Sequence, residues 1–243
     1  MFLFMNDSPY QQGLQIFDEY GVVEQIAHPV VTVTGLPRVR PHEVVYFDND
    51  QLGQVLFLEE DKLEVLLFSS TPVPMGSKVS RTGRQLSVPL GRDMLGVVIN
   101  PLGHVLTGKT YEAEQEREID IPPLSISYRA EVVDPLVTGI SVVDMLLPLG
   151  KGQRELVVGD RKVGKTSFVL SAIKQQVSLG GVVVYAGIGK QSIELERVRM
   201  WLEQQGCAEK VSMVMTSAQD AQSLIYLSPF TAMAVAEYFR DFG

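Results

Sequence analysis

The chain has 243 residues, 45% of them apolar, and 29 acidic against 21 basic residues give it a formal charge of -8. This size and apolar content suffice for one large core or two smaller ones, whereas the acidic balance disfavours nucleic acid as a partner of the whole surface. The single cysteine, Cys207, excludes an intrachain disulfide and a cysteine-rich metal site, and it suggests a reducing compartment.

We interpret residues 1–20 as a short amino-terminal arm. Its apolar start, residues 1–5, is too short for a secretory signal peptide and lacks a basic flank. No stretch of the chain approaches the roughly 20 uninterrupted apolar residues of a membrane-spanning helix. We therefore expect any membrane association to be indirect, through partners.

Residues 21–90 have the pattern of a small β domain. Four segments are rich in β-branched and aromatic residues and are separated by turn-forming residues: 30–34, 43–47, 54–58 and 63–68. Evenly spaced short strands in about 70 residues predict a small closed or nearly closed β-barrel, which hides its own edges.

Residues 91–243 have a different pattern, and we assign them to a second domain. An acidic, polar run at 111–120 reads as an extended connector. Beyond it the chain alternates between predicted strands at 155–158, 181–187 and 211–215 and predicted helices at 165–177, 193–205 and 231–242. This order predicts a doubly wound parallel sheet with helices on both faces and right-handed crossovers.

The segment 159–166 fits the pattern of a phosphate-binding loop between a strand and a helix. Its main-chain N–H groups would converge on phosphate oxygens, and the helix that begins at Lys165 would add the positive end of its dipole. Lys165 would neutralise the β- and γ-phosphates, and the Thr166 hydroxyl would coordinate Mg²⁺. The residues of this predicted nucleoside triphosphate site are Gly159, Asp160, Arg161, Lys162, Val163, Gly164, Lys165 and Thr166.

Hydrolysis would require a carboxylate that orients water and another that helps to hold the metal. Neither strand predicted after the loop runs directly into an acid, because 181–187 leads to Lys190 through Ile188 and Gly189, and 211–215 leads to Thr216. We therefore predict no catalytic residue in this chain.

The chain resembles the α subunit of the F-type ATP synthase over about residues 20–243. The similarity lies in segments of both predicted domains: 81–83, 88–91, 95–98, 135–140, 143–144, 150–161, 227–230 and 237–241. The catalytic β subunit is less similar, because its phosphate loop is rich in glycine, alanine and valine where this chain has Asp160, Arg161 and Lys162. The resemblance implies a small β-barrel followed by a RecA-like nucleotide-binding domain that is incomplete at its carboxyl end. The family's second metal-binding carboxylate, arginine finger and helical domain would all fall beyond Gly243.

The resemblance also implies ATP or ADP with Mg²⁺ as ligands. Carried over by position, the contacts of the family's α subunits fall on Lys162, Gly164, Lys165, Thr166 and Ser167, with Thr166 also a metal ligand. Lys162 stands where the family usually has glutamine.

Lys190 follows Gly189, where the family's α subunits usually have glutamine and its catalytic subunits have glutamate. A charged ammonium group cannot accept a proton from water, so this residue argues against hydrolysis. A shift of one residue in the alignment would place Gln191 there instead, and Lys190 would then be a surface residue.

By resemblance, the chain is a non-catalytic ATP-binding subunit that alternates with catalytic β subunits in a hexamer and contacts the central stalk. It would contribute to ATP synthesis coupled to proton transport only within the complex, an H⁺-transporting two-sector ATPase. That complex lies on the inner face of an energy-transducing membrane, such as the cytoplasmic side of a bacterial plasma membrane. The brevity of the arm 1–20 leaves docking to the peripheral stalk open.

Two other functions stay open from the sequence. One is a self-sufficient ring ATPase of the protein-export or helicase type, which would require a catalytic carboxylate after Gly189. The other is a truncated paralogue that acts as a nucleotide-binding assembly protein.

Overall fold

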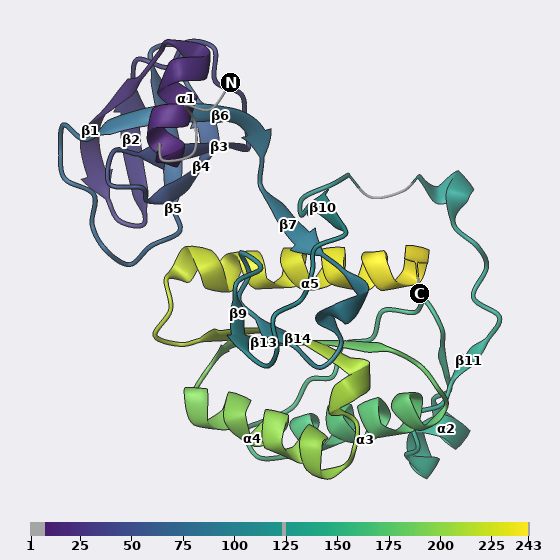
Figure 1. Cartoon of the computed structure of the whole chain (residues 1–243). Helices are drawn as coiled ribbons and strands as arrows, with labels where there is room; N and C mark the ends of the chain where they lie inside the picture. The colour runs from purple at the N-terminus through teal and green to yellow at the C-terminus, as the bar shows by residue number, and fades with distance from the viewer. Residues whose placement is uncertain (1–7, 123–124, 243) are drawn as a thin grey trace.

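The computed structural model describes residues 8–122 and 125–242. A closed β-barrel near the amino end is followed by a layered α/β domain, with a two-stranded ribbon between them (Figure 1). Three stretches lie outside the described residues: the apolar start 1–5, residues 123–124 after the predicted connector, and Gly243. Among the described residues, no helix combines the length and the apolar composition needed to cross a bilayer.

The barrel contains six antiparallel strands in the closed order β1-β2-β5-β4-β3-β6. The strands are β1 (Gly21–Ala27), β2 (Val30–Thr34), β3 (Glu43–Phe47), β4 (Leu52–Leu58), β5 (Lys62–Leu67) and β6 (Lys78–Gln85). The structure thus confirms the predicted barrel and its four predicted strands, and β1 and β6 complete the closure. Each strand is paired on both sides, so the barrel presents no open edge.

Alternate residues of these strands fill the interior of the barrel. Side chains with no exposed surface include Val31, Val33, Val45, Phe47, Val55, Val65, Leu67 and Val79. Gly53 allows this packing, because a Cβ atom there would lie only 2.5 Å from Cγ1 of Val65.

Helix α1 (Pro9–Phe17) packs on the outside of the barrel, where the sequence predicts only an arm. Ser8 caps it in a capping box with Gln11. The buried guanidinium of Arg81 then connects the barrel to the residues beyond the helix, since it donates to Glu43 at 2.8 and 2.9 Å and to Glu19 at 3.0 Å. The same guanidinium lies 4.7 Å from the ring centroid of Phe17.

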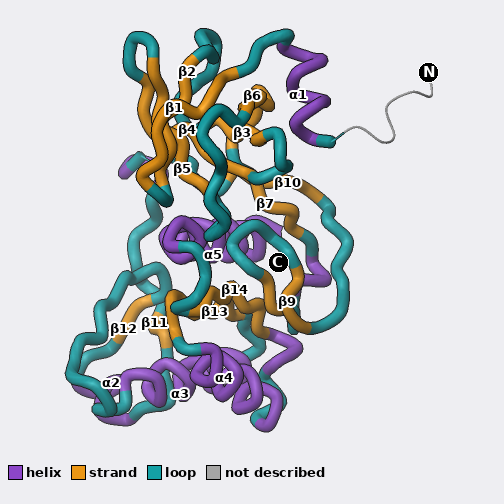
Figure 2. The backbone as a smooth tube through the Cα atoms, turned by 90° about the vertical axis from the view of Figure 1, so that its left-hand side faces the viewer, coloured by secondary structure: helices purple, strands orange, loops and turns teal. Residues whose placement is uncertain are grey.

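The α/β domain is built on a four-stranded sheet in the order β13-β14-β8-β9. Strands β13 (Val183–Lys190), β14 (Val211–Ser217) and β8 (Val98–Ile99) are parallel, and β9 (Val105–Thr107) is antiparallel to β8. Helix α5 (Gln222–Phe242) covers one face, while α3 (Lys165–Ser178) and α4 (Ser192–Gln204) cover the other (Figure 2). The predicted strands 181–187 and 211–215, the helices 165–177 and 193–205, and the two-faced arrangement are confirmed.

Two segments of this domain contain more secondary structure than predicted. The predicted connector 111–120 contains strand β10 (Gln115–Glu118), which pairs with β7 (Ser87–Leu90), and the residues before it contribute β8 and β9 to the sheet. The helix predicted at 231–242 begins at Gln222 and continues through Pro229. Proline normally ends a helix, but here the surrounding turns are held by tertiary contacts: Ser228 and Thr231 are fully buried, and the Thr231 hydroxyl donates to the Pro101 carbonyl at 2.6 Å.

The predicted strand at 155–158 is wrong for this structure. The segment has no strand pairing, and the side chains of Leu156 and Val158 are 84% and 79% exposed. Among the described residues, β13 pairs only with β14 and therefore forms an edge of the sheet. An apolar segment needs a neighbouring strand to satisfy its main chain before it can act as a buried strand.

Residues 126–150 extend away from the sheet as an outer arm (Figure 1). The arm contains the short helix α2 (Ser141–Leu146) and the strand pair β11 (Pro135–Leu136) and β12 (Leu149–Gly150). It returns to the domain through a turn at Thr138, described below.

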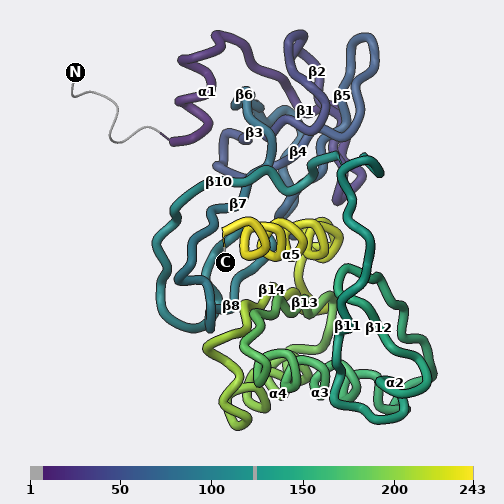
Figure 3. The backbone as a smooth tube through the Cα atoms, turned by 90° about the vertical axis from the view of Figure 1, so that its right-hand side faces the viewer, coloured from purple at the N-terminus to yellow at the C-terminus, as the bar shows by residue number. Residues whose placement is uncertain are grey.

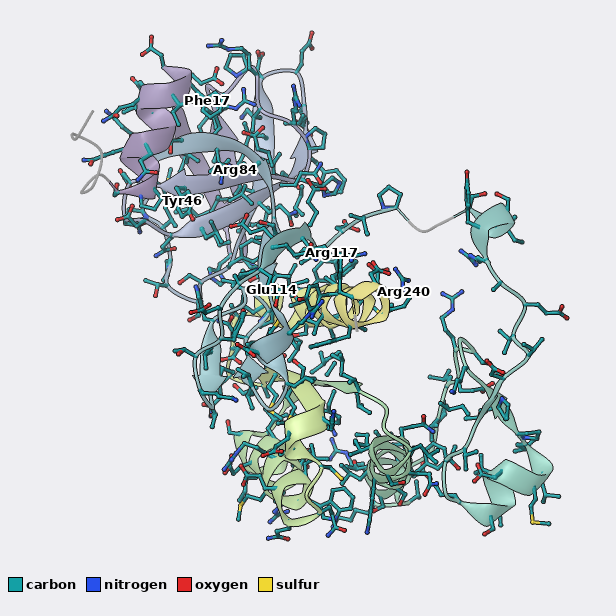
Figure 4. The ribbon with its side chains drawn as sticks, turned by 45° about the vertical axis from the view of Figure 1, so that its right-hand side comes forward. Phe17, Tyr46, Arg84, Glu114, Arg117 and Arg240 are labelled. Atoms are coloured by element: carbon teal, nitrogen blue, oxygen red, sulfur yellow. The ribbon has the colours of Figure 1, made fainter. Side chains whose placement is uncertain are left out.

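The β7–β10 ribbon connects the two bodies through ion pairs to α5. Arg117 on β10 lies 2.9 Å from both Glu237 and Asp241, and the Tyr238 hydroxyl donates to Glu114 at 2.8 Å. Helix α5 thereby lies between this ribbon and the sheet (Figure 3), and the side chains of Glu114 and Arg117 lie beside it (Figure 4). We retain the division into 1–20, 21–90 and 91–243 as a proposal.

Candidate functional site

The glycine-rich loop 159–166 leads directly into α3. Gly164 is the N-cap residue, and its φ of +97° lies in the left-handed region that glycine adopts without strain. Lys162 also has a positive φ, +66°, so the chain turns twice before the helix begins at Lys165. This curvature brings the loop around the amino end of α3, where main-chain N–H groups lack helical partners.

The Lys165 side chain lies across the curved loop. Its ammonium donates to the carbonyl oxygens of Gly159 and Asp160, each at 2.6 Å. A phosphate group bound by the loop would offer this ammonium charged oxygens in place of neutral carbonyls, and charge-assisted hydrogen bonds are the stronger ones. The geometry therefore suits an anionic ligand.

A turn before the loop is connected to α3. Asp144 accepts hydrogen bonds from the Thr138 N–H and hydroxyl at 2.8 and 2.7 Å and from the Gly139 N–H at 2.9 Å. These bonds, led by the one from the Thr138 main chain, hold the pKa of Asp144 below its usual range. Gln176 of α3 donates to the Val137 carbonyl at 2.6 Å, so the turn is attached to the helix that follows the loop.

Thr166 lines a cavity of about 320 Å³ beside the loop. Lys190 enters this cavity from the end of β13, and Glu194, Arg197 and Trp201 enter it from α4. The remaining predicted loop residues, Gly159, Asp160, Arg161, Lys162, Val163 and Gly164, are exposed, as is Ser167. The structure therefore brings Thr166 and Lys190 to one cavity and places Gln191 on the exposed surface at the start of α4.

The α4 residues of the cavity were missed by sequence reasoning. Glu194, Arg197 and Trp201 are three and four residues apart, which places them on one face of a helix. That spacing was a usable signal, but only the packing of α4 against α3 shows that this face meets Thr166.

The cavity suits Mg²⁺ only in a limited way. Mg²⁺ usually retains several waters and takes phosphate oxygens together with one or two protein oxygens, so the Thr166 hydroxyl fits one such position. Among residues 8–122 and 125–242, no group of three or more histidine, cysteine, aspartate or glutamate side chains could hold a metal ion. Lys190 and Arg197 also bring two positive charges to the cavity that Thr166 lines.

Comparison with known proteins connects this site to one family. Residues 139–243 match the model described as ATP synthase alpha/beta family, nucleotide-binding domain. The chain is 38% identical to ATP synthase subunit alpha of Lawsonia intracellularis over 96% of its own length and 46% of that protein's length. It is 39% identical to ATP synthase subunit alpha 3 of Paraburkholderia xenovorans, over 92% of this chain and 42% of that one. It is 37% identical to ATP synthase subunit alpha of Aquifex aeolicus, over 93% and 45%. The chain thus spans less than half the length of the curated relatives it matches.

Proposed function

The chain belongs to the ATP synthase alpha/beta family, and from this premise we propose that it is a non-catalytic, ATP-binding subunit of the F-type ATP synthase. One observation carries the proposal: the Lys165 ammonium lies within the curve of the loop, held only by two carbonyl oxygens that a phosphate can replace. The similarity to relatives named ATP synthase subunit alpha supports the choice of family member.

In this proposal the loop holds ATP or ADP by its phosphates. The main-chain N–H groups of 159–164 and the amino end of α3 bind the phosphate oxygens, and Lys165 exchanges its carbonyl partners for the β- and γ-phosphates. Lys162, within the loop, and Ser167, just after it, add contacts to the phosphates. Mg²⁺, when bound with the nucleotide, would take the Thr166 hydroxyl as a ligand and neutralise phosphate charge.

The site binds nucleotide without turning it over. A charged Lys190 cannot accept a proton from water, and it occupies the end of β13 beside Thr166. Strand β14 ends at Ser217, and the nearby Asp220 carboxylate already accepts the Ser217 N–H at 2.6 Å. The nucleotide therefore has a structural or regulatory role.

The remainder of the proposal concerns the assembly. The chain would alternate with catalytic β subunits in a hexamer and contact the central stalk. Any contact with the peripheral stalk would involve the amino-terminal arm, which includes helix α1. It would take part in ATP synthesis coupled to proton transport on the inner face of an energy-transducing membrane, the cytoplasmic face in a bacterium. No observation favours the ring ATPase or the assembly paralogue over this function.

Isothermal titration calorimetry with ATP tests the nucleotide site. We expect Lys165→Ala to weaken ATP binding by about 10- to 100-fold, because it removes charged hydrogen bonds worth roughly 1.5–3 kcal/mol. Lys174→Ala is the matched control: it lies on the same helix, and its ammonium pairs with Gln205 rather than with the loop. Equal ATP affinity of the two variants, with unchanged circular dichroism, would remove the basis of the proposal.

A further inference from the structure

Two positively charged side chains share the cavity beside the phosphate loop. Lys190 comes from the end of β13 and Arg197 from the middle of α4, and within the described residues neither forms a salt bridge. The neighbouring Arg199 differs, because Glu196 and Glu203 of the same helix pair with it. Glu196 and Glu203 are thus paired with Arg199, and Glu194 is the α4 carboxylate that lines the cavity with Arg197.

The position of Lys190 is set by its main chain. Gly189 has a φ of +57°, and its N–H donates to the Thr216 hydroxyl at 3.3 Å. The Lys190 carbonyl accepts the Ala218 N–H at 2.9 Å, which attaches the end of β13 to the residues after β14. The half-buried Lys190 side chain is therefore directed from a fixed strand end.

The cavity adjoins the amino end of α3, because Thr166 lines it. Thr166 follows Lys165 directly in α3, so a phosphate chain held by the loop and by Lys165 would reach the cavity that Thr166 lines. Glu194 is the one carboxylate among the cavity residues named above, and the two cations outnumber it. Lys190 is half-buried, where a charge attracts an anion more strongly than in open solvent, whereas Glu194 and Arg197 are exposed.

We propose that Lys190 and Arg197 form a cationic subsite for the terminal phosphate of a nucleoside triphosphate, so that this site binds the triphosphate even without a divalent metal. The inference rests on the proposed nucleotide-binding function and adds a specificity to it. Two protein cations supply part of the charge that Mg²⁺ supplies at ordinary phosphate loops. The subsite therefore favours ATP over ADP, because only ATP carries the third phosphate.

The chain contains its own reporter for this cavity. Trp201 is the only tryptophan in the sequence, and it lines the cavity together with Lys190 and Arg197. Its fluorescence in the full chain responds to a ligand in the cavity and requires no label. It also reads binding directly, independent of any turnover.

The test is a titration of the full chain with ATP and with ADP, in Mg²⁺ and in EDTA, followed by Trp201 fluorescence and calorimetry. We expect the unaltered chain to bind ATP in EDTA within about tenfold of its affinity in Mg²⁺. Lys190→Gln and Arg197→Gln should each weaken ATP binding in EDTA by about 10- to 100-fold, since each removes a charged hydrogen bond, and should change ADP binding much less. Lys190→Arg, which keeps the charge, should retain most of the affinity.

Lys210→Gln controls for the loss of bulk charge. Lys210 lies just before the amino end of β14, whereas Lys190 lies at the carboxyl end of β13. Because these strands are parallel, the two lysines lie at opposite strand ends of the sheet. Circular dichroism and the fluorescence of the unliganded chain establish that each variant is folded. Should Lys190→Gln fail to fold, Arg197→Gln and Lys190→Arg carry the comparison.

The outcomes separate this inference from the function on which it rests. If the unaltered chain binds ATP only with Mg²⁺, or if Lys210→Gln weakens binding as much as Lys190→Gln, the subsite is refuted while nucleotide binding stands. ATP and ADP affinities that fall equally in Lys190→Gln also refute it. A chain that binds neither nucleotide under either condition overturns the proposed function and this inference together.

Discussion

The barrel buries its apolar side chains, whereas the outer part of the α/β domain leaves many of its apolar side chains exposed. In the barrel, valines such as Val31, Val45 and Val65 are completely buried. Between residues 126 and 163, large apolar side chains remain exposed over most of the segment, including Ile126, Val133, Met145, Leu146, Leu147, Leu156, Val158 and Val163. Both regions contain valine, leucine and isoleucine, so the difference lies in which strands are available as neighbours.

Antiparallel strands find their partners nearby in the chain, whereas parallel strands need partners from distant segments. Each barrel strand pairs with two others within residues 21–85. Within the part of the chain that the structure describes, β13 has one partner strand and the apolar segment 155–158 has none. The barrel strands therefore satisfy one another's main-chain hydrogen bonds. We expect the barrel to be locally more stable than the outer part of the α/β domain.

The largest expected effect is in the barrel, at Arg81. Arg81→Met leaves Glu43 buried without a cationic partner and leaves Glu19 only its pair with the exposed Arg38, and breaking such a buried group costs about 3–5 kcal/mol. Urea unfolding followed by far-ultraviolet circular dichroism measures this loss, because the only tryptophan lies in the other domain. Arg38→Met is the control, since its pair with Glu19 has a 70% exposed arginine and should contribute less than about 1 kcal/mol. Similar losses in both variants would contradict the barrel's dependence on the buried cluster.

A matched pair of valine substitutions compares the two regions directly. Val65→Ala opens space in a completely buried core and should destabilise the barrel by about 2 kcal/mol. Val158→Ala changes a side chain that is 79% exposed and should stay within about 0.5 kcal/mol of the parent chain. Both are read from urea midpoints. A large effect at Val158 would mean that residues 155–158 are packed as a strand in solution.

The smallest expected effect is a pH dependence of the attachment of α5. Hydrogen bonds from Arg240 and then from Arg117 lower the pKa of Asp241 to about 2. Since the folded pKa is below the unfolded one, the stabilisation is present above about pH 4 and is lost as the pH falls toward 2. The effect is small because Asp241 is partly exposed and Arg240 is its neighbour in the unfolded chain too.

Acid unfolding monitored by circular dichroism between pH 5 and 2 checks this expectation, with Asp241→Asn as the comparison. The parent chain should lose slightly more stability across this range than the variant. Parallel curves would mean that the Arg117 pair contributes nothing to holding α5 against the ribbon.

Much of the fold follows from local patterns. The barrel strands and the helices at 165–177 and 193–205 were predictable because alternation and helical spacing are properties of short segments. The continuation of α5 through Pro229 was not, because burial of Ser228 and Thr231 against the rest of the domain overrides a local preference. The strand predicted at 155–158 was wrong for a different reason. Its apolar pattern requires a neighbouring strand, and the described residues do not supply one.

The amino-acid sequence by itself determined the glycine-rich loop 159–166, because its conformation depends on glycines and a following helix that are adjacent in the chain. It also determined the presence of Lys190 after Gly189 and the absence of an acid there. Only the tertiary structure decided that Thr166, Lys190, Arg197 and Trp201 line one cavity. Those side chains come from α3, β13 and α4, and they meet because both helices pack on the same face of the sheet (Figure 2).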